Sequence, residues 1–357
     1  MTTDTITIPR WVDRHLHLRD GDMLEAVLPH TLSTQAAAAV IMGNLQHPNE
    51  TSTIANTIAY RERIKALIPP GSDFNPIMTC YLTDEITREE VIRGFKEGIW
   101  RAVKLYLSLK DGSGGTSNSS YGVKDLRGRY PLFAAMEKEG IPLLGHFESV
   151  DPDTDEFDRE MICLYLNVIP LHEAFPGLKI VFEHLTDSRA ADFVVSAGPN
   201  VFATVTPHHL MINRNAMYNG GMNPIKYCRP VPKREEHRRR VRNIVTSGHP
   251  RFGAGSDSAP WDKAAKSRST GCKGGIFNAL AAPALYATVF DQDNAMEHFE
   301  PFMSRNFVEI YGAKPSNRTM TLIRKPYTIP AEFSTENGEV VEVFKGGETL
   351  PWKLVVR

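Results

Sequence analysis

The sequence predicts a (β/α)8 barrel with a C-terminal extension, and three observations support this fold class. Short apolar runs recur along the chain, segments with helical periodicity separate them, and most runs end in a polar residue. Buried parallel strands have this character, because helices cover both faces of their sheet. Eight such units fit the length of a barrel domain. The runs span residues 10–18, 37–45, 74–82, 101–107, 141–148, 178–186, 200–209 and 251–260.

The segments between the runs have helical charge and capping patterns. Asp84–Gly98 has acidic residues early and closes with glycine, and Asp125–Gly140 is similar. Arg61–Leu67 carries charges at i, i+4 spacing. Residues 233–247 combine an apolar stripe with a basic run, which we interpret as a solvated outer face in preference to a nucleic-acid surface. Strands that alternate with such helices indicate βαβ units and a parallel sheet.

A doubly wound open sheet is the structural alternative to the barrel. Such a sheet is expected to carry a glycine-rich phosphate loop after its first strand, and residues 15–22 (HLHLRDGD) do not form one. We therefore expect a barrel domain over residues 1–300. Residues 301–357 contain short strand-like pieces and are expected to pack on the barrel as an extension. Residues 111–120 (DGSGGTSNSS) have the composition of a flexible loop.

Composition excludes several classes of protein. The 357 residues carry 41 Lys+Arg against 42 Asp+Glu, a net charge of -1, which argues against a general nucleic-acid binder. An apolar fraction of 41% argues against disorder, and no apolar run is long enough to span a membrane. The N-terminus lacks the pattern of a signal peptide. The scattered Cys80, Cys163, Cys228 and Cys272 are expected to be reduced thiols in a cytoplasmic protein.

The polar residues at the strand ends carry the chemistry, because active sites of such barrels lie at that end. Singly, each has an ordinary explanation: a histidine that ends a strand is more often a core residue, and an aspartate before a turn is often a helix cap. Together, four histidines and one aspartate project into one mouth, and imidazole and carboxylate are ligands that zinc prefers. The predicted ligands are His15, His17, His146, His184 and Asp257.

Lys104, at the end of the fourth run, is the candidate for a bridging group. Five ligands exceed what one tetrahedral zinc with an open position needs, so the sequence predicts two metal ions. A charged lysine would repel them, whereas a lysine carboxylated by CO2 is an anionic bridge. A solvent-facing lysine or a core ion pair is the alternative for Lys104, and its apolar flanks argue against the first of these.

Eight motifs in order along the chain resemble the dihydroorotases, specifically the short bacterial-type class of the amidohydrolase superfamily. The opening motif is HLHLRDGDM at residues 15–23, and the others stand in family order along most of the chain. This resemblance implies a (β/α)8 barrel with a binuclear zinc centre. The other motifs are MTCYLTD (78–84), KLY (104–106), TSNSS (116–120), VFEHLT (181–186), TPHHLMINRN (206–215), GSDSAP (255–260) and YATVF (286–290).

The resemblance also implies roles for individual residues. His15, His17 and Asp257 correspond to ligands of the first metal, and His146 and His184 to ligands of the second. Carboxylated Lys104 would bridge the two ions. The groups that correspond to the substrate-binding residues are Arg19 and Asn44, which would hold a carboxylate, and Thr116 and Ser117, which lie where the family has a loop that closes over the ligand.

The activity implied is the reversible cyclisation of N-carbamoyl-L-aspartate to L-dihydroorotate in pyrimidine biosynthesis. Two cations would lower the pKa of a bridging water and generate hydroxide, which attacks the cyclic amide. Asp257 would act as general acid and base, moving the proton between the nucleophile and the ring nitrogen. Arg19 can recognise a carboxylate with two parallel hydrogen bonds, although a salt bridge with Asp20 or Asp22 is its alternative.

Three positions near the expected substrate depart from the family pattern. Trp261 stands where the family has a histidine that contacts the substrate carboxylate. Lys273 lies in GCKGG (271–275), where the family has a stretch rich in Cys, Gly and Ala, and it either replaces the lost positive charge or points outward. Arg229 stands where several relatives have an apolar residue. The alternative hypothesis is therefore a related hydrolase that opens a different carboxylate-bearing cyclic amide, imide or lactone. A non-catalytic barrel is a third hypothesis, and retention of all six metal-centre residues argues against it.

The sequence leaves the metal identity open, because these ligands also accept Mn, Co or Fe. Relatives in the family are often homodimers, but no interface is evident in the sequence. A small acidic cyclic substrate is the expected partner, with no nucleic acid and no membrane. His209 either shapes the pocket or caps a loop. The remaining histidines are expected to be ordinary surface or core residues: His30, His47, His172, His237, His249 and His298.

Overall fold

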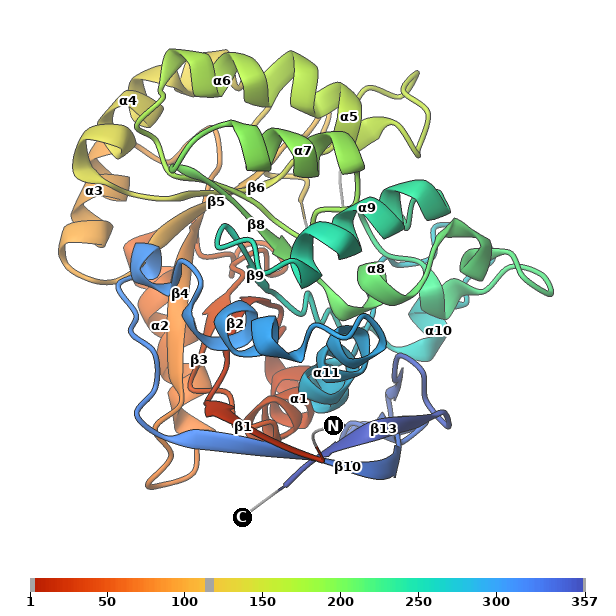
Figure 1. Cartoon of the computed structure of the whole chain (residues 1–357). Coiled ribbons are helices and arrows are strands. Elements are labelled where there is room, and N and C mark those ends of the chain that lie inside the picture. The colour runs from red at the N-terminus through yellow and green to blue at the C-terminus, as the bar shows by residue number, and fades with distance from the viewer. Residues whose placement is uncertain (1–3, 113–118, 356–357) are drawn as a thin grey trace.

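Eight parallel strands form the centre of the molecule, as the sequence predicts (Figure 1). The computed structural model describes residues 4–112 and 119–355. Each strand lies within one of the eight predicted runs, and their order in the sheet is their order in the chain. The strands are β2 (Val12–Leu16), β3 (Ala38–Ile41), β4 (Asn75–Tyr81), β5 (Ala102–Tyr106), β6 (Leu143–His146), β7 (Ile180–Phe182), β8 (Val201–Val205) and β9 (Phe252–Ala254).

The barrel closes between β2 and the segment after β9. Leu16 and Ser258 form a parallel bridge. The Asp257 amide donates to the His15 carbonyl at 2.9 Å, and the His17 amide donates to the Ser258 carbonyl at 3.2 Å. These contacts place the two ends of the sheet side by side, so the barrel prediction is confirmed over the open-sheet alternative.

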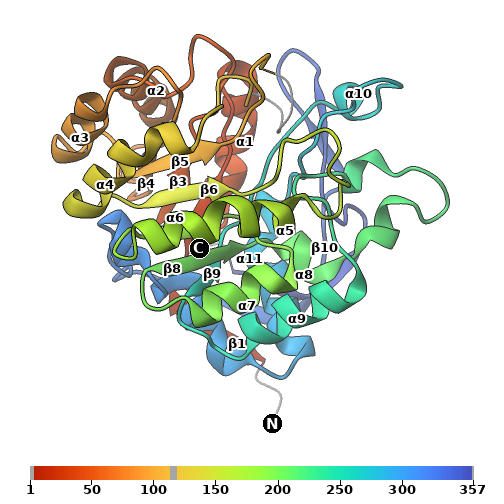
Figure 2. The ribbon, with the colours of Figure 1, turned by 90° about the horizontal axis from the view of Figure 1, so that it is seen from above.

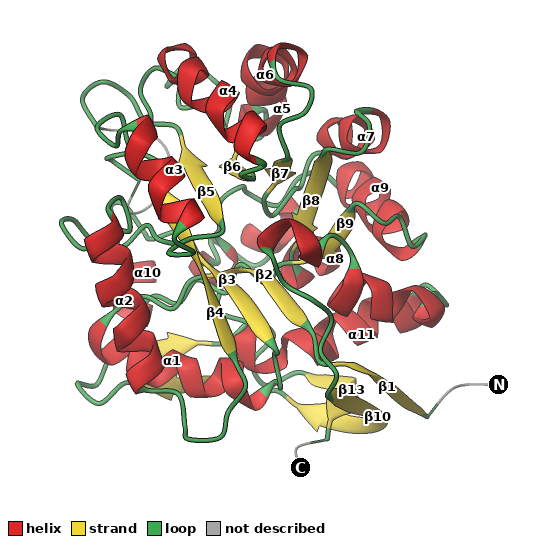
Figure 3. Cartoon of the chain, turned by 90° about the vertical axis from the view of Figure 1, so that its left-hand side faces the viewer, coloured by secondary structure: helices red, strands yellow, loops and turns green. Residues whose placement is uncertain are grey.

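Helices cover the outside of the barrel, and α4, α6, α7 and α9 follow one another around it (Figures 2 and 3). The helix predicted over residues 84–98 begins at Arg88, and Thr87 is its N-cap. The helix predicted over residues 125–140 is capped at its C-terminus by Gly140, which has a φ angle of 70°. The helices are α1 (Gly21–Ser33), α2 (Ile54–Ala66), α3 (Arg88–Lys96), α4 (Tyr130–Glu139), α5 (Arg159–Cys163), α6 (Ile169–Ala174), α7 (Ser188–Ser196), α8 (Pro207–Met211), α9 (Glu235–Thr246), α10 (Lys263–Lys266) and α11 (Ala282–Gln292). Short one-turn or π-helical segments occupy 127–129, 164–168, 214–217, 224–226, 279–281, 296–298, 301–305 and 308–311.

The N-terminal end of the barrel is closed by residues that follow α11. Phe307, Ile310 and Tyr311 are buried in one apolar cluster with the first residues of several barrel strands. The fully buried Arg14 of β2 donates to backbone carbonyls of this segment, including Asn306 at 3.0 Å, and its guanidinium lies 5.1 Å from the Phe307 ring centre. The opposite end of the barrel is therefore the end that holds the open mouth.

A small antiparallel sheet joins the two ends of the chain beside the barrel (Figure 3). β1 (Thr5–Pro9) pairs with β10 (Thr319–Thr328), and β10 pairs with β13 (Thr349–Leu354), which packs on α11. A hairpin of β11 (Glu332–Ser334) and β12 (Val340–Glu342) lies between β10 and β13 in sequence. The N-terminal strand thus shares a sheet with the C-terminal segment, while the boundary at residue 300 stays a prediction. Within the described ranges, no helix is long and apolar enough to cross a membrane.

Candidate active site

The predicted ligand residues meet at the C-terminal ends of the strands. His15 and His17 lie on and just after β2, Lys104 lies on β5 and His146 ends β6. His184 and Asp257 follow β7 and β9. All six side chains are buried, with residue exposures between 0% and 7%. The barrel therefore gathers titratable groups from five different strands at one point.

His15, His17 and Asp257 form the first group. The Nε2 atoms of the two histidines are 3.3 Å apart. Asp257 Oδ1 lies 3.4 Å from His15 Nε2 and 3.2 Å from His17 Nε2. Burial holds the pKa of both imidazoles well below the ordinary value, so both rings are neutral and present lone pairs. Three such donors converging on one point can hold a metal ion.

His146 and His184 form the second group, with His146 Nδ1 and His184 Nε2 3.1 Å apart. Lys104 belongs to the same cluster. Its ammonium nitrogen is fully buried, and no described residue accepts a hydrogen bond from it. Burial lowers the pKa of Lys104 to about 8. A buried amine without a partner, and with a lowered pKa, fits a group that reacts with CO2 better than it fits a structural ion pair.

Two buried carboxylates orient the histidines, and sequence reasoning missed both. Glu183 contacts His15 Nδ1 and accepts from the Thr204 hydroxyl at 2.8 Å. Glu148 lies 2.7 Å from His146 Nε2. Each contact engages one ring nitrogen and leaves the other free to face the cluster, which is how metal-binding histidines are held. A carboxylate two residues after His146 was the available signal for Glu148.

Burial and hydrogen bonding act differently on these two carboxylates. Burial raises the pKa of Glu183 to about 7. Burial also opposes ionisation of Glu148, but the hydrogen bond with His146 lowers its pKa to about 2. Asp257 behaves like Glu183, because burial raises its pKa to about 7. A carboxyl group with a pKa near neutrality can both accept and release a proton.

Three site residues have left-handed backbone conformations that only glycine adopts without strain. The φ angles are 60° for Arg19, 43° for His184 and 41° for Asp257. Such strain persists where the surrounding structure holds it, and it clusters at functional sites. Here it occurs where strands β2, β7 and β9 turn away from the barrel, so it aims the side chains into the mouth.

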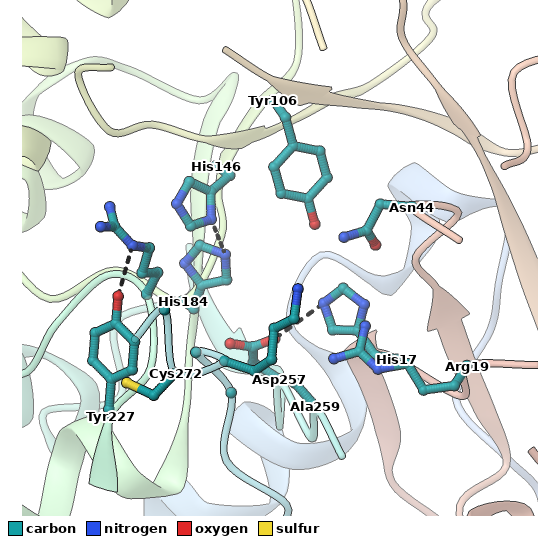
Figure 4. Close-up of a pocket in the computed structure, with 15 residues that line it drawn as sticks. His17, Arg19, Asn44, Tyr106, His146, His184, Tyr227, Asp257, Ala259 and Cys272 are labelled. Carbon is teal, nitrogen blue, oxygen red and sulfur yellow. Dashed lines mark hydrogen bonds and ion pairs between the residues drawn. The ribbon is translucent and has the colours of Figure 1, made fainter. Parts of the chain in front are cut away.

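A pocket of about 290 Å3 opens beside the cluster (Figure 4). Arg19 and Asn44 lie on the same side of this pocket as His17, while His146, His184 and Tyr227 lie across it. Asn44 Oδ1 is buried and has no hydrogen-bond partner among the described residues. The pocket therefore offers a cation and an amide beside the titratable cluster.

The other predicted substrate contacts have mixed positions. Arg229 and Lys273 line the pocket, and Arg229 is already paired with Glu156 at 2.9 Å. Trp261 is not among the lining residues, and its indole N–H donates to the Gly274 carbonyl at 3.0 Å. Direct contact between Trp261 and a substrate in this pocket is therefore not supported. Thr116 and Ser117 lie outside the described residues.

His209 is buried outside the pocket lining. Its Nδ1 lies 2.9 Å from the Thr206 hydroxyl, and its Nε2 lies 2.9 Å from the Pro230 carbonyl. Thr206 is also the N-cap of α8. The Nδ1 contact thus stays within the cap of α8, and the Nε2 contact joins α8 to the segment that carries Arg229.

A parallel barrel with neutral imidazoles, a buried lysine and a carboxyl group at its strand ends defines a hydrolase of the amidohydrolase type. The chain is 46% identical to a dihydroorotase of Erythrobacter litoralis over 352 residues, covering 99% of both chains. It is 45% identical to a dihydroorotase of Yersinia enterocolitica over 350 residues, covering 98% of both. The chain belongs to the dihydroorotase family. No protein-family model matches it.

Solved structures agree with this assignment. A Saccharomyces cerevisiae dihydroorotase in complex with 5-fluoroorotic acid is 29% identical, with a TM-score of 0.89 over 99% of both chains. A Campylobacter jejuni dihydroorotase is 31% identical, with a TM-score of 0.86 over 99% of this chain and 98% of that one. An L-hydantoinase of Arthrobacter aurescens, 12% identical with a TM-score of 0.79 over 98% of this chain and 83% of that one, shares the fold.

Proposed function

We propose that this enzyme catalyses the reversible cyclisation of N-carbamoyl-L-aspartate to L-dihydroorotate. Its relatives at 44–46% identity over nearly their full length carry the name dihydroorotase. The observation that carries the proposal is the buried cluster at the strand ends, which lies beside a pocket with Arg19 and Asn44. The reaction opens or closes a cyclic amide C–N bond, and it needs an activated water and a proton carrier near a carboxylate site.

The residues of the cluster fit two divalent metal ions. His15, His17 and Asp257 would hold one ion, and His146 and His184 would hold the other. Carboxylated Lys104 would bridge them, which agrees with its buried and unpartnered nitrogen. Neutral imidazoles and carboxylates suit zinc. When bound, the ions would supply an acidified water and polarise the amide carbonyl.

The side chains of the protein perform the remaining tasks. Asp257 would take a proton from the attacking water and deliver it to the ring nitrogen, and would reverse this in cyclisation. Arg19 and Asn44 would bind the carboxylate of the substrate. Arg229 and Lys273 add positive charge to the pocket wall, which favours a small acidic ligand.

The test of this proposal is a panel of ring substrates. Metal-loaded enzyme is expected to hydrolyse L-dihydroorotate and to cyclise N-carbamoyl-L-aspartate, with little activity on hydantoins, cyclic imides or lactones. Turnover of one of those rings, with none of dihydroorotate or carbamoyl aspartate, would contradict the proposal. It would instead support a hydrolase whose pocket has changed its substrate.

The metal centre has its own test. Elemental analysis is expected to find about two metal ions per chain, with zinc as the most abundant metal. Replacing Lys104 by alanine removes the bridging group, so the variant is expected to lose metal and activity together. A Lys104→Ala variant that kept both ions and full activity would rule out the bridging role.

The cellular setting forms a further part of the proposal. The four cysteines are free, and Cys80, Cys163 and Cys228 are buried thiols, which agrees with a reducing cytoplasm. We also propose a homodimer, because relatives in the family are often homodimers. Sedimentation of the metal-loaded enzyme would test it.

A further inference from the structure

The guanidinium of Arg19 is held against Trp261. Its carbon Cζ lies 4.5 Å from the centre of the indole ring. Its Nε donates to the Pro260 carbonyl at 3.1 Å. Within the described ranges, no hydrogen bond occupies its two terminal nitrogens, and Arg19 lines the pocket. The contacts thus fix one edge of the guanidinium and leave the other edge available to a ligand.

A second cation lies over the same indole. Lys273 Nζ is 5.3 Å from the centre of the Trp261 ring, and Lys273 lines the same pocket as Arg19. Lys273 has no salt bridge to a carboxylate in the part of the chain that the structure describes, whereas Arg229 is paired with Glu156. Lys273 is therefore a cation whose charge is not matched by a neighbouring acid.

The indole that both cations contact is itself firmly placed. Trp261 Nε1 donates to the Gly274 carbonyl, in the same loop as Lys273. Buried Lys266 fixes that loop by donating to the carbonyls of Tyr227 at 3.1 Å and Lys273 at 3.4 Å. The ring is absent from the lining of the active-site pocket and lines a neighbouring hollow of about 490 Å3, whereas Arg19 and Lys273 line both. Trp261 thus contacts both cations at the boundary between the two hollows.

Two like charges beside one ring repel each other, and the electron-rich ring face offsets only part of this cost. An anion between them would remove the repulsion, and the free edge of Arg19 suits a carboxylate. We propose that Trp261 is a positioning residue, whose indole holds Arg19 and Lys273 as a pair of cations that bind the substrate carboxylate. This inference rests on the proposed function for the identity of the substrate.

The experiment compares four variants of the metal-loaded enzyme with wild type: Trp261→Leu, Trp261→Phe, Lys273→Met and, as a matched control, Lys138→Met on the exposed surface of α4. Loss of the ring or of the lysine charge is expected to raise KM for L-dihydroorotate about tenfold, with kcat within about threefold. Trp261→Phe keeps a ring face and is expected to stay within about threefold of wild type. Lys138→Met is expected to leave KM unchanged.

The double variant Trp261→Leu/Lys273→Met tests whether Trp261 acts by positioning Lys273 or whether the two side chains affect substrate binding independently. If the indole acts through Lys273, the double variant is expected to raise KM by much less than the product of the two single effects. Multiplicative effects would overturn the inference, and so would an unchanged KM in Trp261→Leu. A fall in kcat and metal content with KM unchanged would show a purely structural role and would also overturn it. If Trp261→Leu does not fold, Lys273→Met and Trp261→Phe still give the KM readout.

Calorimetric binding of 5-fluoroorotate, the ligand of the yeast enzyme structure, distinguishes this inference from the proposed function. Should wild type bind 5-fluoroorotate yet turn over neither substrate, the proposed function fails alone. In that case a Kd raised about tenfold in Trp261→Leu and Lys273→Met supports the paired cations. A Kd unchanged in both variants, or no binding to wild type, would overturn the inference.

Discussion

At the scale of single residues, burial decides the protonation states that the site needs. His15 and His184 are neutral because their rings are buried among other nitrogens, and Lys104 is a weaker base for the same reason. Asp257 keeps its proton to higher pH than an exposed aspartate. Burial makes each charge cost free energy. It therefore keeps the imidazoles neutral, with lone pairs that can bind a metal ion, and it keeps Asp257 able to carry a proton.

Glu183 gives a prediction at this scale. Its carboxylate contacts His15 Nδ1 and leaves His15 Nε2 facing Asp257. Glu183→Gln keeps the shape but weakens the contact that orients the ring, so metal affinity is expected to fall about 10-fold or more. Competition with a chelator of known affinity measures this change. Glu236→Gln on the exposed face of α9 is the control, and equal affinities in the two variants would remove Glu183 from the metal site.

At the scale of elements, local signals in the sequence were enough to find the barrel strands and its charged outer helix. Helix α9 buries Val241, Ile244 and Val245 and exposes Arg239 and Arg240, which confirms the predicted apolar stripe. The acidic Glu235 in its first turn accepts hydrogen bonds from the Arg238 and Arg239 side chains. Those bonds explain a basic run on a surface helix without a nucleic-acid partner.

Glu235 gives a pH prediction. Hydrogen bonding, first from Arg238, lowers the pKa of Glu235 from 4.5 to about 2. A carboxyl group with a lower pKa in the folded state stabilises the fold above its unfolded pKa, and this stabilisation is lost as the pH falls toward the folded value. Glu235→Gln is expected to lower the free energy of unfolding by about 0.5–1 kcal/mol at neutral pH, after allowance for solvent screening. Its deficit should shrink between about pH 5 and 3.

Urea unfolding across that pH range measures the difference. Glu236→Gln is again the matched control, because Glu236 is exposed and lies on the same turn of α9. If the loss of unfolding free energy in Glu235→Gln stayed constant from neutral pH to pH 3, the ion pair of Glu235 would not be its cause.

Non-local contacts could not be predicted from the sequence. Strand β1 pairs with β10 across more than 300 residues, from Thr5 with Ile323 to Pro9 with Thr319, and no local pattern encodes that pairing. Trp261 was expected at the substrate, but its indole N–H is used by Gly274 thirteen residues later. The six residues of the predicted metal centre stand out in the sequence because each lies on a barrel strand or within three residues after one, and their role as ligands stays a prediction. Glu183 was missed because an acid inside a buried run has no local signature.

At the scale of the whole molecule, the two ends of the barrel have separate tasks. The N-terminal end is closed by Phe307, Ile310 and Tyr311 and by the buried Arg14, so it supplies stability. The C-terminal end bears the cluster and the pocket. The near-neutral net charge of -1 therefore conceals a local set of cations, Arg19, Arg229 and Lys273, that line the pocket beside the cluster.

We propose that the strand-end cluster is a metal centre at which the dihydroorotate ring is opened. The most direct measurement follows hydrolysis of L-dihydroorotate while zinc is added back to chelator-treated enzyme. We predict no turnover without metal and full turnover at about two ions per chain. Full activity in the metal-free chain, or no activity in the reloaded and folded enzyme, would contradict the account.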